Sequence, residues 1–240
     1  MSEVKLLIVG YGRMGKMIED VVSQTEGARV IGKVDPLLPA WDEAERPDAI
    51  LDFSAPQGIQ ETVELALRYR CALVIGTTGL DESARTLIDE AAGQVPVICQ
   101  SNYSLGVAVL KRAVRMTAQA LGEGFDIEIV ETHHNKKKDA PSGTALSLAE
   151  AANLDGKPLL YGRQGLVGAR GNEIGLHAVR GGSVAGEHRV LFLGDNETIE
   201  LRHEAQSRRI FAVGAVRAAL FLAGRKAGLY TMDDVVAGAE

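Results

Sequence analysis

Hydrophobic and polar positions follow two different periods along the first hundred residues. Short continuous apolar runs are typical of strands buried on both faces, whereas apolar residues recurring every three or four positions are typical of amphipathic helices. The runs cover residues 6–9, 30–34, 49–53, 72–75 and 95–98, and the helical repeats between them include residues 14–22 and 59–67. This alternation predicts right-handed crossovers and an α/β, Rossmann-like, doubly wound parallel sheet.

The pattern changes after Gly124, beyond a helical repeat over residues 110–121. Strand-like segments follow at residues 127–129, 174–180, 188–193 and 198–203, with glycine-rich turns between them. Because no regular helices link these later strands, we expect a second, α+β domain with an open mixed sheet. A last helical repeat over residues 212–223 is expected to return to the first domain. The predicted domains are residues 1–103 with 214–240 for dinucleotide binding, and residues 104–213 for substrate binding and oligomerisation.

Composition narrows the class of protein. The 240 residues are 46% hydrophobic and 24% charged, which is typical of a folded chain long enough for two domains. The 26 basic and 32 acidic residues give a net charge of −6, which disfavours nucleic-acid and anionic-membrane partners. Two cysteines, Cys71 and Cys99, favour a reducing compartment. No apolar run approaches the roughly 20 residues of a membrane span, so we expect a cytoplasmic protein.

A glycine-rich turn, GYGRMG, directly follows the first predicted strand and opens the first predicted helix. The spacing G-x-G-x-x-G is typical of a turn that brings the backbone and a helix N-terminus close to a pyrophosphate. We therefore predict that a dinucleotide is bound by Gly10, Tyr11, Gly12, Arg13, Met14 and Gly15.

Asp35 ends the second predicted strand, 20 residues beyond Gly15. A carboxylate at that place accepts hydrogen bonds from an adenosine ribose and repels a 2′-phosphate. We therefore expect NADH to bind at least as well as NADPH, although Arg13 and Lys33 are nearby cations that oppose this preference. The alternative is that Asp35 is a simple turn residue before Pro36.

Two further strand ends carry small hydroxyl residues and glycine. In an open α/β sheet, ligands bind beyond the carboxyl ends of the strands, so these residues suit a nicotinamide ribose and carboxamide. The predicted residues are Gly76, Thr77 and Thr78 after the fourth strand, and Ser101, Asn102, Tyr103 and Ser104 after the fifth. Ordinary turn chemistry is the alternative for both segments.

The segment from Glu131 to Ala145, ETHHNKKKDAPSGTA, gathers two histidines and three lysines within six residues of an acidic chain. A predicted strand ends in the histidines, and an Ala/Leu-rich helix follows, capped by Ser142 or Thr144. Cations beside a helix N-terminus favour a small anion, especially a carboxylate. Metal binding is disfavoured, because adjacent histidines on a strand point to opposite faces and no cysteine or H-x-x-x-H partner is near.

This segment resembles the signature E-x-H-H-x-x-K-x-D-A-P-S-G-T-A of the 4-hydroxy-tetrahydrodipicolinate reductase (dihydrodipicolinate reductase) family. The similarity extends over essentially the whole chain. It includes GTTG at 76–79, SNYS-x-GV at 101–107, R-x-G-x-x-G around Arg163 and Gly168, EIG-x-x-x-VRGG at 173–182, GEH at 186–188 and GAVRAAL at 214–220. One departure is the glycine turn, which is one residue shorter than the G-A-x-G-R-M-G of many members.

The resemblance implies that NADH and/or NADPH reduces a cyclic, unsaturated dicarboxylate to tetrahydrodipicolinate after loss of water. It implies that the second domain forms a homotetramer through its sheet. By motif position, His133 and Lys137 match proton-donating residues, and either of them is a candidate for the decisive transfer. His134, Gly143 and Thr144 match positions that contact the substrate. Lys136 and Lys138 are expected to give electrostatic support.

Two alternatives remain open at this stage. Another two-domain dehydrogenase of a small acid would use the glycine turn and Asp35 equally, and only the segment at 131–145 argues against it. A non-catalytic NAD(H)-sensing protein would need a DNA-binding helix pair or a basic arm, and neither pattern is found. The remaining histidines, His177, His188 and His203, are expected to be structural or surface residues.

Overall fold

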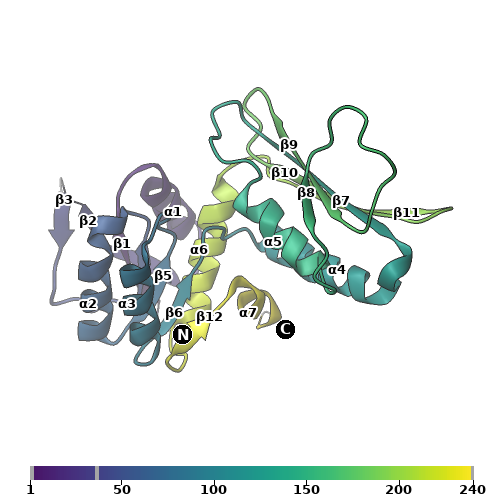
Figure 1. Ribbon diagram of the computed structural model, residues 1–240. Helices are drawn as coiled ribbons and strands as arrows, with labels where there is room; N and C mark the ends of the chain where they lie inside the picture. Colours follow the sequence, from purple (N-terminus) through teal and green to yellow (C-terminus); the bar gives the residue numbers. More distant parts are fainter. Residues whose placement is uncertain (1–2, 36–37, 239–240) are drawn as a thin grey trace. The chain divides into compact units, whose positions relative to one another are not determined.

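The protein, seen here in a computed structural model, is described for residues 3–35 and 38–238. The chain forms two compact units (Figure 1). Unit 1 comprises the chain up to Leu105 together with the chain from Arg209 onward, and unit 2 comprises Gly106–Arg208. The second predicted boundary, near Val213, lies inside a helix that starts at Arg209. Among the described residues, no helix is long and apolar enough to cross a membrane.

Unit 1 contains a seven-stranded sheet in the order β12-β6-β5-β4-β1-β2-β3. The strands are β1 (Val4–Val9), β2 (Ala28–Asp35), β3 (Leu38–Trp41), β4 (Ala49–Asp52), β5 (Ala72–Ile75), β6 (Pro96–Cys99) and β12 (Gly228–Tyr230). Neighbouring strands are parallel except β2 and β3. Strands β4 and β5 are buried at every position, which confirms the interpretation of continuous apolar runs as central parallel strands.

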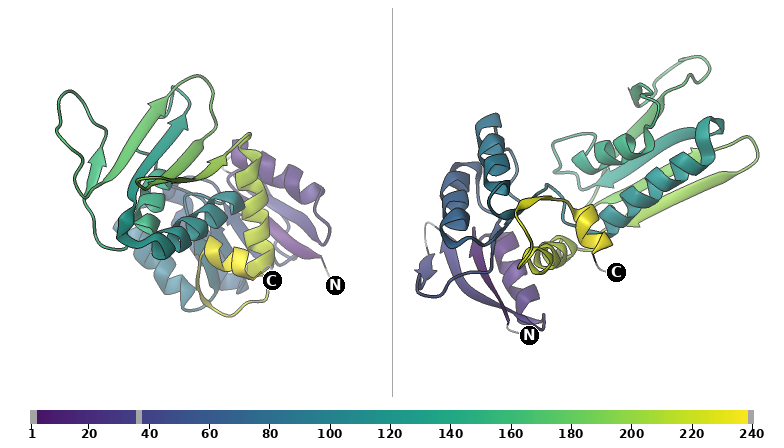
Figure 2. Two further views of the ribbon diagram at one scale, coloured as in Figure 1. Left: turned by 90° about the vertical axis from the view of Figure 1, so that its right-hand side faces the viewer. Right: turned by 90° about the horizontal axis from the view of Figure 1, so that it is seen from below.

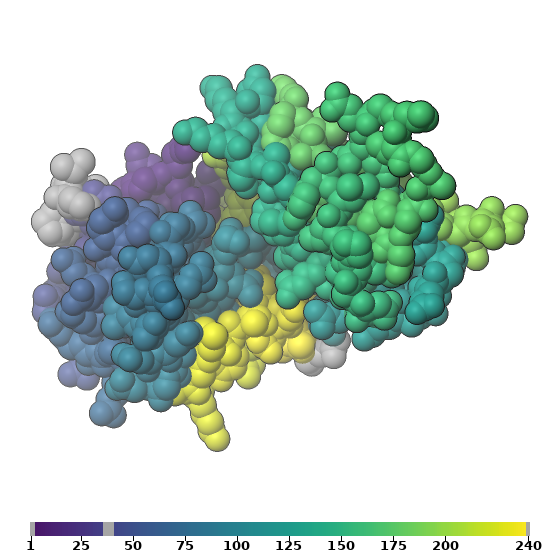
Figure 3. Space-filling view, in the orientation of Figure 1, coloured from purple at the N-terminus to yellow at the C-terminus, as the bar shows by residue number. Residues whose placement is uncertain are grey.

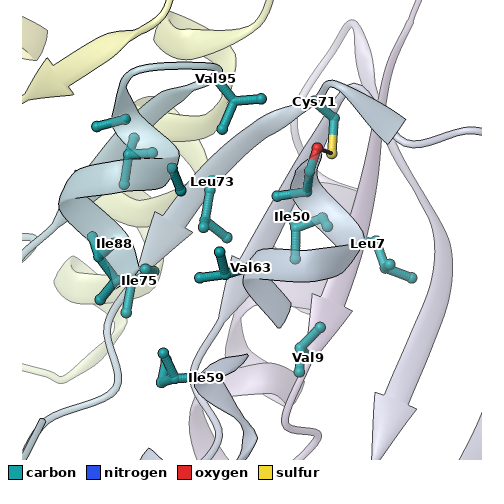
Figure 4. Close-up of a cluster of buried hydrophobic side chains, with 14 residues drawn as sticks. Leu7, Val9, Ile50, Ile59, Val63, Cys71, Leu73, Ile75, Ile88 and Val95 are labelled. Atoms are coloured by element: carbon teal, nitrogen blue, oxygen red, sulfur yellow. Dashed lines mark hydrogen bonds between the residues drawn. The ribbon is translucent and has the colours of Figure 1, made fainter. Parts of the chain in front are cut away.

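Helices cover both faces of this sheet. They are α1 (Arg13–Ser23), α2 (Ile59–Tyr69, preceded by the 3₁₀ turn η1 at Pro56–Gly58), α3 (Glu82–Ala92), α6 (Arg209–Leu222) and α7 (Met232–Ala237). Strand residues Leu7 and Leu73 pack with Val63 of α2 and Ile88 of α3 in one fully buried cluster (Figure 4). Helices α1 and α6 pack together on the other face. Burial of each such side chain contributes about 1.5–3 kcal/mol.

The C-terminal segment completes unit 1. Strand β12 pairs in parallel with β6 and also contacts α3. Figure 3 shows these yellow residues lying against the blue segments of the first hundred residues. The sequence pattern predicted α6 but missed β12, α7, α3 and the antiparallel edge strand β3.

Unit 2 contains a five-stranded mixed sheet in the order β11-β10-β7-β9-β8 (Figure 2). The strands are β7 (Asp126–His133), β8 (Leu159–Tyr161), β9 (Ile174–Arg180), β10 (Glu187–Leu193) and β11 (Thr198–Glu204). Strand β7 pairs in parallel with β9 and antiparallel with β10. Helices α4 (Leu105–Leu121, followed by η2 at Gly122–Gly124) and α5 (Gly143–Ala152) pack on one face of the sheet. Both predicted fold classes are confirmed.

Candidate functional site

The carboxyl ends of β6, β5, β4, β1 and β2 lie along one edge of unit 1, because these strands are parallel neighbours. Every loop predicted to bind a dinucleotide leaves the sheet at this edge. The loops are Gly10–Gly15 after β1, Asp35 at the end of β2, Gly76–Thr78 after β5 and Ser101–Ser104 after β6. The topology therefore brings the predicted cofactor residues to one place, as expected for a doubly wound sheet.

The glycine turn is built for close approach. Gly10 has a φ of +86°, and an added Cβ would lie 2.6 Å from the Phe53 carbonyl oxygen. An added Cβ at Gly15 would lie 2.3 Å from the Gly10 carbonyl oxygen, so this glycine lets α1 pack against the turn. At Gly12, an added Cβ meets no described atom within 4 Å, and no side chain caps α1 there. This open helix N-terminus fits a dinucleotide pyrophosphate.

Asp35 joins the end of β2 to the glycine turn. Its carboxylate oxygen Oδ2 accepts a hydrogen bond from the Tyr11 backbone N–H at 3.1 Å. The acid is therefore fixed beside the turn, where its proposed ribose contact requires it. Arg13 and Met14, the first two residues of α1, are exposed and half-buried respectively.

Asp52, at the end of β4, organises the same edge and was missed by sequence reasoning. The carboxylate is fully buried and accepts hydrogen bonds from the Thr62 and Thr77 hydroxyls, each at 2.5 Å, and from the Ser54 N–H at 3.1 Å. The Thr77 side chain is thus used inside unit 1, whereas Thr78 is exposed. Strand β4 was predicted, but its place between β1 and β5 is set by topology.

The structure corrects the expected role of the Tyr103 side chain. The residue is 2% exposed, and its hydroxyl donates to the carbonyl oxygens of Ile75 at 2.7 Å and Ile98 at 3.1 Å. Burial raises the pKa of the Tyr103 phenol. The side chain ties β5 to β6 inside the core, so it does not offer a polar group to a ligand. Beside it, Asn102 Oδ1 accepts from the Ser104 N–H at 2.8 Å, and Ser101 is exposed.

In unit 2, strand β7 places Glu131 and His133 on its buried face, in line with the core residues Ile127 and Ile129. His133 Nδ1 lies 2.5 Å from Glu131 Oε2. A carboxylate at this distance holds the ring with Nδ1 protonated, so that Nε2 is the nitrogen presented to a ligand. The pair therefore orients an imidazole at the end of a strand.

Arg180 binds the same carboxylate from the neighbouring strand β9. Its Nη1 and Nη2 donate to the two Glu131 oxygens at 2.8 and 2.7 Å, and the Ser142 N–H donates at 3.1 Å. Desolvation acts to raise the pKa of Glu131, but hydrogen bonds from Arg180 and His133 outweigh it and lower the pKa. Desolvation lowers the pKa of His133, although Glu131 opposes this effect.

A second histidine, His188 of β10, lies against His133. The ring centroids are 5.1 Å apart in an edge-to-face arrangement, and Nε2 of His188 lies 3.1 Å from the Ser142 hydroxyl oxygen. Burial lowers the pKa of His188 to about 4, which keeps the ring neutral at pH 7. An added Cβ at Gly186 would lie 3.0 Å from His133 Nε2, so this glycine keeps space at that nitrogen.

The loop after β7 separates the three lysines. Lys137 is half-buried, and its Nζ lies 3.0 Å from an oxygen of Asp139, whereas Lys136 and Lys138 are exposed. His134 contacts Arg208 through Nε2 at 3.3 Å, and its buried Nδ1 has no partner in the described part of the chain. Lys137 is thus the lysine that the fold holds beside the His133 segment.

Helix α5 begins directly beside Glu131. Ser142 is its N-cap, because the hydroxyl oxygen accepts from the Ala145 N–H at 3.1 Å. Gly143 and Thr144 form the first turn, whose N–H groups and positive dipole end suit a carboxylate. Within the described residues, no group of histidine, cysteine and acidic side chains is arranged to hold a metal ion.

Sequence reasoning gave Arg180 and Glu131 no role and expected His188 only as a structural or surface residue; the structure has it buried against His133. The spacing 127, 129, 131 and 133 was a usable signal, because alternate residues of a strand share a face. Arg180 meets His133 only through the register of β7 with β9. That pairing spans nearly fifty residues and has no local signal.

Comparison with known proteins matches both units of the chain to one protein family. Residues 4–103 match the family model described as dihydrodipicolinate reductase, N-terminus, and residues 106–236 match dihydrodipicolinate reductase, C-terminus. The 4-hydroxy-tetrahydrodipicolinate reductase of Caldanaerobacter subterraneus subsp. tengcongensis is 44% identical, over 97% of this chain and 98% of the relative. That of Zymomonas mobilis is 43% identical, over 98% of each chain.

Comparison with solved structures finds a member of the same family. A dipicolinate-bound dihydrodipicolinate reductase from Paenisporosarcina sp. TG-14 has a TM-score of 0.76 and 25% identity, over 95% of this chain and 97% of the other. The DAP dehydrogenase of C. glutamicum, with a TM-score of 0.57 and 14% identity over 98% and 96% of the two chains, shares the fold. From these matches and its signature residues, the chain belongs to the dihydrodipicolinate reductase family.

Proposed function

We propose that this chain catalyses the NAD(P)H-dependent reduction of 4-hydroxy-tetrahydrodipicolinate to tetrahydrodipicolinate in lysine and diaminopimelate biosynthesis. One observation carries the proposal. In a chain that matches the family along both units, the signature histidine His133 is held by a buried carboxylate at a strand end, beside Lys137 and the start of α5. The other readings, a different dehydrogenase and an NAD(H) sensor, gain no support from these matches.

The proposed substrate site lies on unit 2. The substrate carries two carboxylates, so binding requires compact cations and N–H donors. His134, Lys137 and the backbone of Gly143 and Thr144 supply both kinds of group within one loop and one helix turn. The dipicolinate-bound relative, which holds a flat ring with two carboxylates, supports this choice of ligand class.

The proposed cofactor site is the strand-end edge of unit 1. The glycine turn and the N-terminus of α1 would hold the pyrophosphate, and Asp35 the adenosine ribose. The loops at 76–78 and 101–104 would hold the nicotinamide end, with Asp52 and Tyr103 fixing those loops from inside. When bound, NADH or NADPH supplies the hydride.

Loss of water from the substrate leaves a conjugated imine-like ring, and reduction then adds one hydride and one proton. We assign the proton to His133, because Glu131 holds Nδ1–H and opposes the desolvation that lowers the pKa of the ring, so that Nε2 is the donor of the protonated form. Lys137 is the alternative donor of the same proton, and its ammonium adds positive charge where negative charge develops. The exposed Lys136 and Lys138 contribute to the field around the loop.

We also propose a homotetramer formed through the face of the unit 2 sheet opposite α4 and α5, and a cytoplasmic location. Val130, Leu191 and the 47%-exposed Val179 lie on this face by register. Glu128 lies among them and is bound by Arg163 and His177. Light scattering coupled to gel filtration measures the oligomeric state, and a monomer at micromolar concentration would remove this part of the proposal.

The activity is tested by mixing the pure protein with NADH or NADPH and with substrate made in situ by the preceding synthase. Oxidation of the cofactor, followed at 340 nm, is expected only in the complete mixture. Turnover of another small acid instead would favour the related dehydrogenase. Cofactor binding without any turnover would favour the sensor.

A further inference from the structure

The glycine turn of this chain carries a tyrosine whose ring sits in a small charged cluster. The Tyr11 hydroxyl donates to the Glu19 carboxylate on α1, seven residues beyond Gly12 and two helical turns along. Lys33 Nζ lies 2.5 Å from a Glu19 oxygen and 4.6 Å from the centre of the Tyr11 ring. We call Tyr11, Glu19 and Lys33 the turn cluster.

The turn cluster is tied to the predicted ribose position. The Tyr11 backbone N–H donates to Asp35, and Lys33 lies two residues before Asp35 on β2, so both side chains project from the same face of the strand. Lys33 is therefore the strand β2 cation within reach of a 2′-phosphate next to Asp35. The ion pair of Lys33 with Glu19 decides whether the Lys33 ammonium is available to a 2′-phosphate.

The Lys33 ammonium contacts both the Glu19 carboxylate and the Tyr11 hydroxyl. Lys33 and Glu19 are about two-thirds buried, which weakens the screening of their ion pair by water. A hydrogen bond to Glu19 raises the pKa of Lys33, and the hydrogen bonds of Lys33 and Tyr11 lower the pKa of Glu19. Arg13 and Lys16 are further cations on the first turns of α1, and Lys16 Nζ is 5.9 Å from the Tyr11 ring centre.

We infer that the Glu19–Lys33 pair sets the choice between NADH and NADPH in this chain. With Lys33 engaged by Glu19 and Tyr11, Asp35 dominates the ribose position and NADH is favoured. Without the Glu19 carboxylate, Lys33 turns to the 2′-phosphate and NADPH affinity rises. This inference rests on the proposed function only in requiring that unit 1 binds the dinucleotide.

The test is a set of cofactor titrations without substrate, followed by fluorescence of the reduced nicotinamide. In Glu19→Gln the Kd for NADPH is expected to fall roughly fivefold, the scale of one screened charge contact, while the Kd for NADH changes less than about twofold. In the double variant Glu19→Gln/Lys33→Gln this gain disappears, which separates Lys33 from Arg13 and Lys16. Glu26→Gln, at an exposed acid in the loop before β2, makes the same charge change as a control.

An unchanged NADPH to NADH ratio of Kd values in folded Glu19→Gln overturns the inference. A gain that persists in the double variant also overturns it, because Lys33 is then not the source of the gain. An equal gain in Glu26→Gln overturns it as well, because that result means a general charge effect. Circular dichroism confirms folding of each variant. If the native chain binds neither cofactor, the proposed function fails, and that outcome is distinct from an unchanged ratio.

Discussion

Glu131→Gln is the substitution that most directly probes how His133 is held. The native carboxylate is 1% exposed and accepts hydrogen bonds from His133, the Ser142 N–H and both terminal nitrogens of Arg180. Glutamine keeps the size of the side chain but removes the charge and offers one oxygen in place of two. Its amide NH₂ must then face a group that is itself a donor.

The structure sets the scale of the effect. Removing one partner of a buried ion pair costs about 3–5 kcal/mol, and the lower end applies because Arg180 keeps the carbonyls of Val179 and Asp139 as acceptors. Native proteins have about 5–15 kcal/mol of stability, so the variant is expected to fold. A hydrogen bond to a charged group contributes about 1.5–3 kcal/mol, which is about 10- to 100-fold in the population of protonated His133.

The assay is the pH dependence of kcat and kcat/KM, together with urea unfolding. Glu131 acts to raise the pKa of His133, so its loss lowers that pKa further. We expect kcat at pH 7 to fall about 10- to 100-fold. The limb of the profile that falls as pH rises is expected to move to lower pH, because His133 must be protonated to donate. The Kd for NADH is expected to be unchanged.

Glu128→Gln is the matched control. Glu128 lies on the opposite face of β7, and hydrogen bonds from Arg163 and His177 outweigh desolvation and lower its pKa to about 2. The same chemical change there destabilises unit 2 without touching His133. If folded Glu131→Gln keeps the kcat and the pH profile of Glu128→Gln, His133 is not the proton donor.

Two further results are expected. Lys137→Ala is expected to lower kcat by about 10²–10⁴-fold and to leave the Kd for NADH unchanged. The control Lys136→Ala, at an exposed lysine, is expected to lower kcat less. An unchanged kcat in Lys137→Ala would exclude Lys137 as an acid. His188 is neutral when folded, because burial lowers its pKa from the ordinary 6.5 of a histidine to about 4, so the unfolded chain binds the proton first as pH falls. The free energy of unfolding therefore falls by about 2 kcal/mol between pH 7.5 and 5, and less in His188→Gln; equal slopes in urea unfolding would contradict the burial argument.

The elements with a clear period were predicted from sequence. Apolar runs such as 72–75 became central strands, and the helical repeat at 212–223 became α6. Strand β12 has only three residues and begins with a glycine, and β3 contains Pro39, which argues against a strand in a sequence pattern. Their pairing with β6 and β2 depends on tertiary contacts rather than on local preference.

The candidate site was predicted as a set of residues, and its internal support was not. GYGRMG and HHNKKK are contiguous, so their spacing is visible in one chain segment. Asp52 and Arg180 act through strand order and register, which a single sequence does not contain. Tyr103 was placed with its loop neighbours, but its ring turns into the core because the hydroxyl finds two backbone carbonyls there.

A crystal structure with NADH and pyridine-2,6-dicarboxylate is the most direct measurement of the mechanism. It is expected to show the carboxylates bound by Lys137, His134 and the N–H groups of Gly143 and Thr144. The nicotinamide C4 is expected about 3–3.5 Å from the ring of the bound dicarboxylate. The His133 Nε2 is expected within hydrogen-bond reach of the same dicarboxylate ring. A complex in which the analogue binds elsewhere, or in which His133 and Lys137 are remote from the nicotinamide, would contradict the assignment.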